Sequence, residues 1–269
     1  GLAFIILSMT RPQLGTILEM TTRRGIDLIF VIDTSVSMLA EDIKPNRLER
    51  AKFAVAEMID ALEGDRVGIV GFAGAAFVQC PLTLDYGAAK MHIDALDVGS
   101  VPAQGTAIGE AIKVAHRAFT VKERQSKVIV LLTDGEDHEG NPVEAAREAA
   151  DDGVRVDIIG IGTPDGELIP VRNEDGSIDY KRDEDGRVVK TVLHEAALSE
   201  VAETGKGRYY RLTSGGGEIK DILTTISKME KGEIGSRRMT RYEERFQYPL
   251  FVALLLLAGE ILISERRKR

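Results

Sequence analysis

The sequence predicts an α/β fold with a doubly wound, mostly parallel sheet and helices on both of its faces. Short apolar runs rich in β-branched residues recur at residues 24–33, 65–74, 126–135 and 154–162. They lack a polar alternation, which is typical of parallel strands buried on both faces. Segments of helical period separate them, and this alternation builds α/β folds. With 43% hydrophobic residues among 269, the chain can bury one substantial core.

The helices follow the strands in a regular order. Helical periodicity covers residues 46–64, 106–119, 141–153 and 194–205, with a strand at 207–212 and a last helix from 217 to about 232. Asn141 as N-cap with Pro142 after it is a start signal, and Gly64 and Gly153 lie beyond two helix ends. Ligands of such folds bind beyond the carboxyl ends of the strands, so we expect the functional site there.

One segment departs from this alternation. Residues 163–190 are polar and contain repeated Asp-Gly pairs, which predict a β-hairpin insertion with tight turns. A calcium loop is the alternative interpretation. With Gly186 at its sixth position, its first and twelfth positions would be Lys181 and Val192, where carboxylates are required. The spacing therefore disfavours calcium.

The two ends of the chain differ from its middle. An apolar stretch interrupted by Glu260 is long enough to cross a hydrocarbon core of roughly 30 Å as a transmembrane helix. The expected organisation is the end of a preceding transmembrane helix at 1–10, a linker at 11–23, the α/β domain at 24–232, a juxtamembrane linker at 233–245, the transmembrane helix at 246–264 and a basic tail at 265–269. Basic residues flank the last apolar stretch on both sides, but the tighter cluster follows it. That asymmetry favours an extracytoplasmic globular domain.

Charge and cysteine content exclude some classes of function. The formal net charge of −8 disfavours a nucleic-acid-binding protein, which would carry a basic stripe to neutralise phosphates. Cys80 is the single cysteine, so the chain forms no internal disulfide and folds by packing alone. An acidic chain of this kind suits cations or basic partners.

Oxygen-bearing side chains gather at the carboxyl ends of the expected strands. Asp33, Ser35 and Ser37 follow the first strand at alternate positions. Asp134 ends the strand at 126–135, and Thr106 lies in a Gly-containing loop just before a helix. Carboxylate and hydroxyl oxygens are hard ligands that suit Mg²⁺ or Mn²⁺, whereas zinc prefers His or Cys. The five side chains therefore predict a divalent metal site, although each alone is also typical of a turn former or helix cap.

This constellation resembles the metal-ion-dependent adhesion site (MIDAS) of the von Willebrand factor type A (VWA) domain. The family pattern is Asp-x-Ser-x-Ser with a Thr and an Asp from later loops, and all five positions match. The resemblance implies that Ser35, Ser37 and Thr106 bind Mg²⁺ or Mn²⁺ through hydroxyls. Asp33 and Asp134 would bind it directly or through water. One coordination position would stay open, and an Asp or Glu of a protein partner would fill it.

Flanking residues carry a narrower resemblance. The segments at 37–52, 72–89 and 131–150 are similar to the Bat aerotolerance proteins of bacteria, of BatA or BatB type. That family implies a non-catalytic module anchored in the bacterial inner membrane. It also implies other Bat proteins and a MoxR-type AAA+ ATPase as partners in stress tolerance.

Two other classes of function stay open. The first is a Mg²⁺-dependent phosphoryl-transfer enzyme with Asp33 as the nucleophile. Enzymes that resemble haloacid dehalogenases carry a second Asp two residues later, where this chain has Ser35, and no phosphate-binding glycine loop is present in the sequence. The second is a structural membrane scaffold with a vestigial metal site.

Overall fold

The computed structural model divides the chain into two compact units. One comprises Arg24–Ile234, and the other comprises Gly1–Arg23 together with Gly235–Arg269. The structure describes residues 6, 9, 13–101, 105–119, 126–136, 140–172, 177–183, 185–213, 217–227, 229, 232–244 and 247–264. Most of the expected first span at 1–10 and the basic tail at 265–269 lie outside the described residues.

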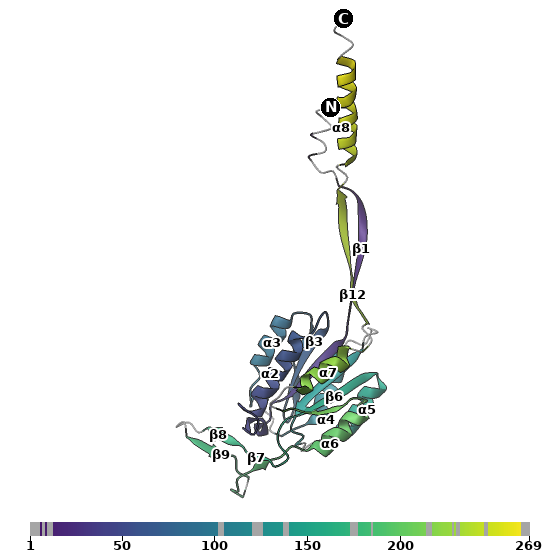
Figure 1. The fold of residues 1–269 in the computed structure, drawn as a ribbon. Coiled ribbons are helices and arrows are strands. Elements are labelled where there is room, and N and C mark those ends of the chain that lie inside the picture. Colours follow the sequence, from purple (N-terminus) through teal and green to yellow (C-terminus); the bar gives the residue numbers. More distant parts are fainter. Residues whose placement is uncertain are drawn as a thin grey trace. The chain divides into compact units, whose positions relative to one another are not determined.

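A six-stranded sheet forms the centre of the larger unit (Figure 1), in the order β11-β6-β5-β2-β3-β4. The strands are β2 (Asp27–Asp33), β3 (Arg66–Phe72), β4 (Ala76–Thr83), β5 (Lys127–Thr133), β6 (Val154–Gly160) and β11 (Tyr209–Arg211). All neighbours are parallel except β3 and β4. The register pairs Asp33 with Phe72 and Thr133 with Gly160, so the carboxyl ends of the central strands lie at one edge. The predicted α/β class with a mostly parallel sheet is confirmed.

Helices cover both faces of this sheet. One apolar cluster packs α2 (Arg47–Asp60), α3 (Tyr86–Asp94) and α7 (Gly217–Ser227) against one face. A second cluster packs α4 (Ile108–Ala118), α5 (Pro142–Asp151) and α6 (Glu195–Thr204) against the other. Central strand residues alternate between the two clusters, which explains why these strands are apolar at nearly every position.

Asparagine side chains begin two of the helices. Asn141 Oδ1 accepts a hydrogen bond from the Glu144 backbone N–H at 3.2 Å, with Pro142 at the first helical position, as the sequence predicts. Asn46 Oδ1 accepts from the Glu49 N–H at 2.8 Å at the start of α2. Each bond satisfies a backbone donor that has no partner inside its helix. The N-terminus of α2 is thereby fixed close to the carboxyl edge of the sheet.

Strand β4 and helix α3 are absent from the sequence-based expectations. Strand β4 is an antiparallel edge strand whose pairing with β3 is irregular between Val67 and Val70. It contains Pro81, and a proline without an N–H donor is tolerated only at a sheet edge or a bulge. The opposite edge is β11, which has only three residues.

The two expected linkers contain strands instead. Strand β1 (Gln13–Gly25) and β12 (Gly232–Glu244) pair in a separate two-stranded sheet, where the sequence predicts linkers at 11–23 and 233–245. Their sequences contain Thr, Ile and Tyr, which favour strands. Pairing between segments more than 200 residues apart has no local signal in either one.

The insertion after β6 consists of short antiparallel strands. Strand β7 (Glu167–Leu168) pairs with β10 (Lys190–Thr191), and β8 (Pro170–Arg172) pairs with β9 (Ile178–Tyr180). Both ends of this insertion therefore meet at the β7–β10 pair.

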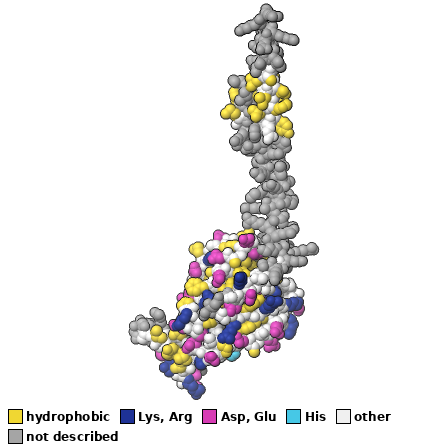
Figure 2. All heavy atoms as spheres, in the orientation of Figure 1, with side chains coloured by type: hydrophobic (Ala, Val, Ile, Leu, Met, Phe, Trp, Pro, Cys, Tyr) yellow, Lys and Arg dark blue, Asp and Glu magenta, His cyan; other side chains and the backbone are white. Residues whose placement is uncertain are grey.

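Helix α8 (Gln247–Ser264) occupies the apolar stretch near the end of the chain. It carries exposed apolar side chains, which Figure 2 shows in yellow: Tyr248, Leu250, Phe251, Val252, Leu254, Leu255, Leu256 and Leu257. By length and hydropathy, none of the helices among the described residues qualifies to cross a membrane.

Replacing Gly207 with alanine is expected to destabilise the larger unit strongly. A Cβ at Gly207 would lie 1.9 Å from the Val156 carbonyl oxygen and 2.5 Å from its carbonyl carbon, and these backbone atoms leave it no room. We expect a loss of about 3 kcal/mol in the free energy of unfolding, the upper end of typical overpacking costs. Urea unfolding measures this loss. The control is Gly217→Ala, where no described atom lies within 4 Å of the added Cβ. Equal losses for the two variants would contradict the steric explanation.

Candidate functional site

The candidate site begins at the carboxyl end of β2. Asp33 is fully buried. Its Oδ1 accepts a hydrogen bond from the Ser35 backbone N–H at 2.9 Å, and its Oδ2 accepts from Thr133 Oγ1 at 2.6 Å. The first bond turns the chain out of the strand, and the second joins β2 to the end of β5.

Ser35 and Ser37 converge just after Asp33. Their Oγ atoms lie 2.9 Å apart, at the start of the 3-10 helix η1 (Val36–Leu39). Ser35 occupies the N-cap position of η1, but its side chain makes no capping hydrogen bond. The capping interpretation therefore does not account for the Ser35 hydroxyl, which turns toward Ser37 instead.

Asp134 brings a second carboxylate to the same place. It follows β5 directly and is fully buried, and the nearby Ser37 side chain favours its ionised form by opposing the rise in its pKa. Its negative charge also acts on Asp33, so the two carboxylates are neighbours. The structure thus brings together four of the five predicted side chains: Asp33, Ser35, Ser37 and Asp134.

Thr106 lies on a loop anchored to the adjacent strand. The backbone N–H of Ala107 donates to the Ala73 carbonyl at 2.8 Å, immediately beyond the end of β3. Thr106 is buried, and the N-cap of α4 is Ala107, so the Thr106 hydroxyl is not the cap. Among the described contacts, no hydrogen bond joins Thr106 to the other four side chains.

Burial and mutual repulsion disturb the ionisation of the two aspartates. Burial, followed by the charge of Asp134, raises the pKa of Asp33 to about 7, although hydrogen bonds from Thr133 and Ser35 oppose the rise. Burial also raises the pKa of Asp134, against the opposing charge of Arg47. Two adjacent buried carboxylates are costly without a cation.

Arg47 is a site residue that the sequence analysis missed. Its side chain is fully buried, and its Nη1 donates to Asp134 Oδ2 at 2.9 Å. Its Nε and Nη2 donate to Asp42 Oδ1 and Oδ2 at 2.9 and 2.7 Å, a bidentate pair. Burial alone would lower the pKa of Arg47, but these contacts with Asp42 and Asp134 raise it, so the guanidinium stays charged.

A signal for Arg47 was present in the sequence. Arg47 is the first residue of α2. A cation there faces the positive end of the helix dipole, which is unfavourable unless carboxylates compensate. An arginine at a helix start, five residues after Asp42, therefore indicated nearby acidic partners.

The charge of the buried cluster suits a divalent cation. Asp33, Asp42 and Asp134 contribute three negative charges and Arg47 one positive charge, which leaves two negative charges when all are ionised. The available donors are carboxylates and hydroxyls, the hard oxygens that Mg²⁺ and Mn²⁺ prefer. Among the described residues, no three His, Cys, Asp or Glu side chains group in a way that holds a metal. Any ion here therefore depends on the serine and threonine hydroxyls.

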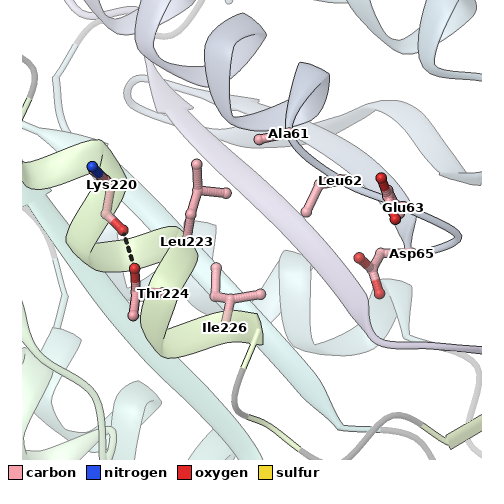
Figure 3. Close-up of a pocket in the computed structure, with 8 residues that line it drawn as sticks. All are labelled: Ala61, Leu62, Glu63, Asp65, Lys220, Leu223, Thr224 and Ile226. Carbon is pink, nitrogen blue, oxygen red and sulfur yellow. Dashed lines mark hydrogen bonds between the residues drawn. The ribbon is translucent and has the colours of Figure 1, made fainter.

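A hollow elsewhere on the domain lacks these features. It measures about 320 Å³ and lies between the end of α2 and α7, near Asp65 at the opposite edge of the sheet (Figure 3). Figure 3 shows Leu62, Leu223 and Ile226 lining it, together with Thr224, whose Oγ1 donates to the Lys220 carbonyl at 2.8 Å. Half of its lining residues are aliphatic, and the others are Glu63, Asp65, Lys220 and Thr224; we assign it no chemistry.

The visible surface of the α/β unit carries both signs of charge. Figure 2 shows acidic and basic side chains interspersed on this face. The face therefore shows no basic stripe of the kind that nucleic-acid binding requires.

Comparison with known proteins relates this fold and motif to one family. Residues 28–136 match the von Willebrand factor type A domain. A UPF0353 protein of Nocardia farcinica is 30% identical over an alignment of 273 positions, covering 96% of this chain and 77% of that protein. The matched range includes Asp33, Ser35, Ser37, Thr106 and Asp134.

Solved structures extend the likeness over more of the chain than residues 28–136. An aerotolerance-related membrane protein of Bacteroides fragilis is 43% identical with a TM-score of 0.73, covering 76% of this chain and 100% of that one. BatB of Bacteroides thetaiotaomicron is 45% identical with the same TM-score, covering 76% and 98%. Proximal thread matrix protein 1 of the mussel byssus, solved with a zinc-occupied MIDAS motif, is 19% identical with a TM-score of 0.56, covering 84% and 50%. That last likeness shows a shared fold.

Proposed function

Because the chain belongs to the BatA/BatB-like family of von Willebrand factor type A proteins, we propose that it is a non-catalytic protein-binding module. In this proposal Asp33, Ser35, Ser37, Thr106 and Asp134 hold Mg²⁺ or Mn²⁺. The ion then binds an Asp or Glu side chain of a partner protein.

The convergence of two carboxylates and two hydroxyls at one strand end carries this proposal. Asp33, Ser35, Ser37 and Asp134 are joined by short contacts. Together with Asp42, the two site aspartates leave two negative charges when all are ionised and Arg47 is counted. Neutral hydroxyls withdraw little positive charge from a bound ion, so it retains affinity for an external carboxylate. The mussel relative with zinc in its MIDAS motif supports a divalent ion in this fold.

The partners are proposed from the same resemblance. Other Bat proteins and a MoxR-type AAA+ ATPase are the candidates, in a bacterial stress-tolerance complex. We further propose that the protein is associated with the bacterial inner membrane through the apolar side chains of α8, with the α/β unit on the extracytoplasmic side. The relative from Bacteroides fragilis, which is described as a membrane protein, supports the association.

The phosphoryl-transfer alternative fits the site less well. A nucleophilic aspartate must reach the phosphorus atom of its substrate. Asp33 is fully buried, and both of its carboxylate oxygens already accept hydrogen bonds. These contacts favour a role in holding an ion.

Asp134→Asn is expected to abolish Mg²⁺-dependent capture of a partner. The variant keeps the shape of the side chain but removes a charge that the ion needs. The measurement is a pull-down from detergent-solubilised bacterial membranes with the tagged full chain, in Mg²⁺ and again in excess EDTA. We expect a partner that the wild type captures only in Mg²⁺ and that Asp134→Asn does not capture.

Asp157→Asn is the matched control. Asp157 is also a buried aspartate bound by an arginine, Arg155, but it lies within β6. The Asp157→Asn variant should be less stable than the wild type and should still capture the partner in Mg²⁺. Capture that survives EDTA would contradict the proposal, as would Mg²⁺-dependent hydrolysis of a phosphate ester that Asp134→Asn abolishes. Absence of the protein from the membrane fraction would contradict the membrane association.

A further inference from the structure

We propose that Arg47 is a positioning residue that locks the insertion to the metal site, so that movement of one is transmitted to the other. The inference deepens the proposed function, because it assigns to that site a means of sensing what contacts the insertion. The group that carries it, called the Arg47 clasp below, comprises Arg47, Asp42, Asp134, Thr163 and Thr191.

Arg47 directs its hydrogen-bond donors to three segments at once. Nε and Nη2 bind Asp42, while Nη1 binds both Asp134 Oδ2 at 2.9 Å and Thr191 Oγ1 at 2.8 Å. Arg47 and Thr191 are fully buried. Water therefore cannot replace these bonds without opening the structure.

Both ends of the insertion are held by the carboxylates that Arg47 binds. Thr163 begins the insertion, and its backbone N–H and Oγ1 donate to Asp42 Oδ2 at 2.9 and 3.1 Å. Thr191 ends it, and its Oγ1 lies 3.3 Å from Asp134 Oδ2. The first residue of the insertion is thus hydrogen-bonded to Asp42, and the last is hydrogen-bonded to Asp134.

Backbone hydrogen bonds continue the connection to the loop after β5. The His194 N–H donates to the Asp134 carbonyl at 3.0 Å, and the Leu193 N–H donates to the Thr163 carbonyl at 3.2 Å. The Val192 N–H donates to Glu136 Oε1 at 3.1 Å. The strand that closes the insertion is therefore bound to the loop that presents Asp134.

Gly162 makes room for the guanidinium. A Cβ at this position would lie 2.8 Å from Arg47 Cζ, and its φ of +135° is unfavourable for other residues. The chain entering the insertion consequently passes in direct contact with Arg47. This close approach leaves little freedom for the base of the insertion to shift independently.

The clasp fixes the orientation of Asp134. Its Oδ2 faces Arg47 and Thr191, and its Oδ1 accepts from the Glu136 N–H at 3.2 Å. Groups behind a metal ligand orient it, and their loss commonly weakens metal binding about 10- to 100-fold. Displacement of the insertion would withdraw the Thr191 hydroxyl and release the carboxylate.

The first test measures Mn²⁺ affinity of the full chain by titration calorimetry. Arg47→Lys keeps the charge but loses the forked geometry, and Thr191→Val removes only the hydroxyl. We expect each to weaken Mn²⁺ binding about tenfold or more. The control is Arg66→Lys, because Arg66 makes the same bidentate contact with buried Asp27 at the other end of β2. It should change Mn²⁺ affinity less than about twofold, within ordinary experimental scatter for a remote site. Unchanged affinity in both clasp variants would overturn the proposal.

The second test follows hydrogen exchange of the Leu193 and Gly166 amides, both of which donate to the Thr163 carbonyl. In wild type, Mn²⁺ should slow their exchange, and Arg47→Lys should abolish that effect. In metal-free protein, Asp134→Asn and Thr191→Val should speed exchange at these amides, whereas Arg66→Lys should not. The metal-free comparison can succeed even when wild type binds no Mn²⁺, which separates failure of the clasp from failure of the metal site. If none of the clasp variants changed the hydrogen-exchange rates of these amides, the coupling would be refuted.

Discussion

Asp33→Asn is expected to abolish Mg²⁺ binding and to make the metal-free protein more stable above pH 7. In the proposed site, Asn cannot supply the negative charge with which Asp33 would hold the ion, directly or through water. Without metal, the ionised Asp33 destabilises the folded state, because it is fully buried beside Asp134. The neutral amide removes that repulsion and keeps the size of the side chain.

The pH dependence of this stabilisation has a defined sign. The pKa of Asp33 is raised from 3.8 to about 7 in the folded protein, so the folded state binds the proton more tightly than the unfolded state. Its stabilising contribution is fully present below about pH 3.8 and is lost as pH rises to about 7. The slope is at most about 1.4 kcal/mol per pH unit for one proton. The Asp33→Asn variant has no such pH-dependent contribution to lose. Its free energy of unfolding should therefore increasingly exceed that of the wild type between pH 4 and pH 7.

Urea unfolding in EDTA from pH 4 to pH 8 checks this prediction. The difference in unfolding free energy between Asp33→Asn and wild type reports the ionisation of Asp33 together with its effect on the neighbouring Asp134. Saturating Mg²⁺ should reverse the order at pH 8, because only wild type gains from binding the ion. A difference that does not vary with pH would show that Asp33 ionises normally.

Arg47→Met is expected to be among the most destabilising single substitutions in the domain. It removes the guanidinium between Asp42 and Asp134, which leaves two buried carboxylates without their cation. Breaking a buried ion pair by removing one partner typically costs about 3–5 kcal/mol. Methionine fills part of the volume, so the loss reflects charge more than packing.

Arg66→Met is the matched control for this loss. Arg66 also binds a fully buried aspartate, Asp27, but its own side chain is 17% exposed and can be replaced by water. We therefore expect a smaller loss, measured by thermal and urea unfolding of both variants. A loss for Arg66→Met as large as that for Arg47→Met would contradict the special role of complete burial.

The parts of the fold that the sequence predicted are those with strong local signals. The four central strands are continuous apolar runs, and their helices begin at residues such as Asn141 with a distinct capping pattern. Strand β4 escaped prediction because Gln79 and Pro81 interrupt its apolar pattern. The pairing of β1 with β12 escaped because neither segment indicates its distant partner.

The site residues also divide into those with a local sequence signal and those that depend on distant segments meeting. Asp33, Ser35 and Ser37 were predictable because their spacing is local and the resemblance names their types. Arg47 was missed, because its one local signal, a basic residue at the start of α2, is weak. An arginine in an amphipathic helix is usually a solvated residue. Its burial depends on Asp42, Asp134 and the insertion meeting at one point, and only the folded chain brings these together.

The edges of the six-stranded sheet bear on how copies of this protein behave when crowded. An exposed edge strand offers unpaired backbone groups on which a neighbouring copy can form a further strand. Strand β4 is a poor template, because Pro81 lacks a donor and the pairing of β4 with β3 is irregular. Strand β11 is too short, with three residues. The sheet is therefore protected against strand exchange between copies, and high local concentrations need not lead to aggregation through its edges.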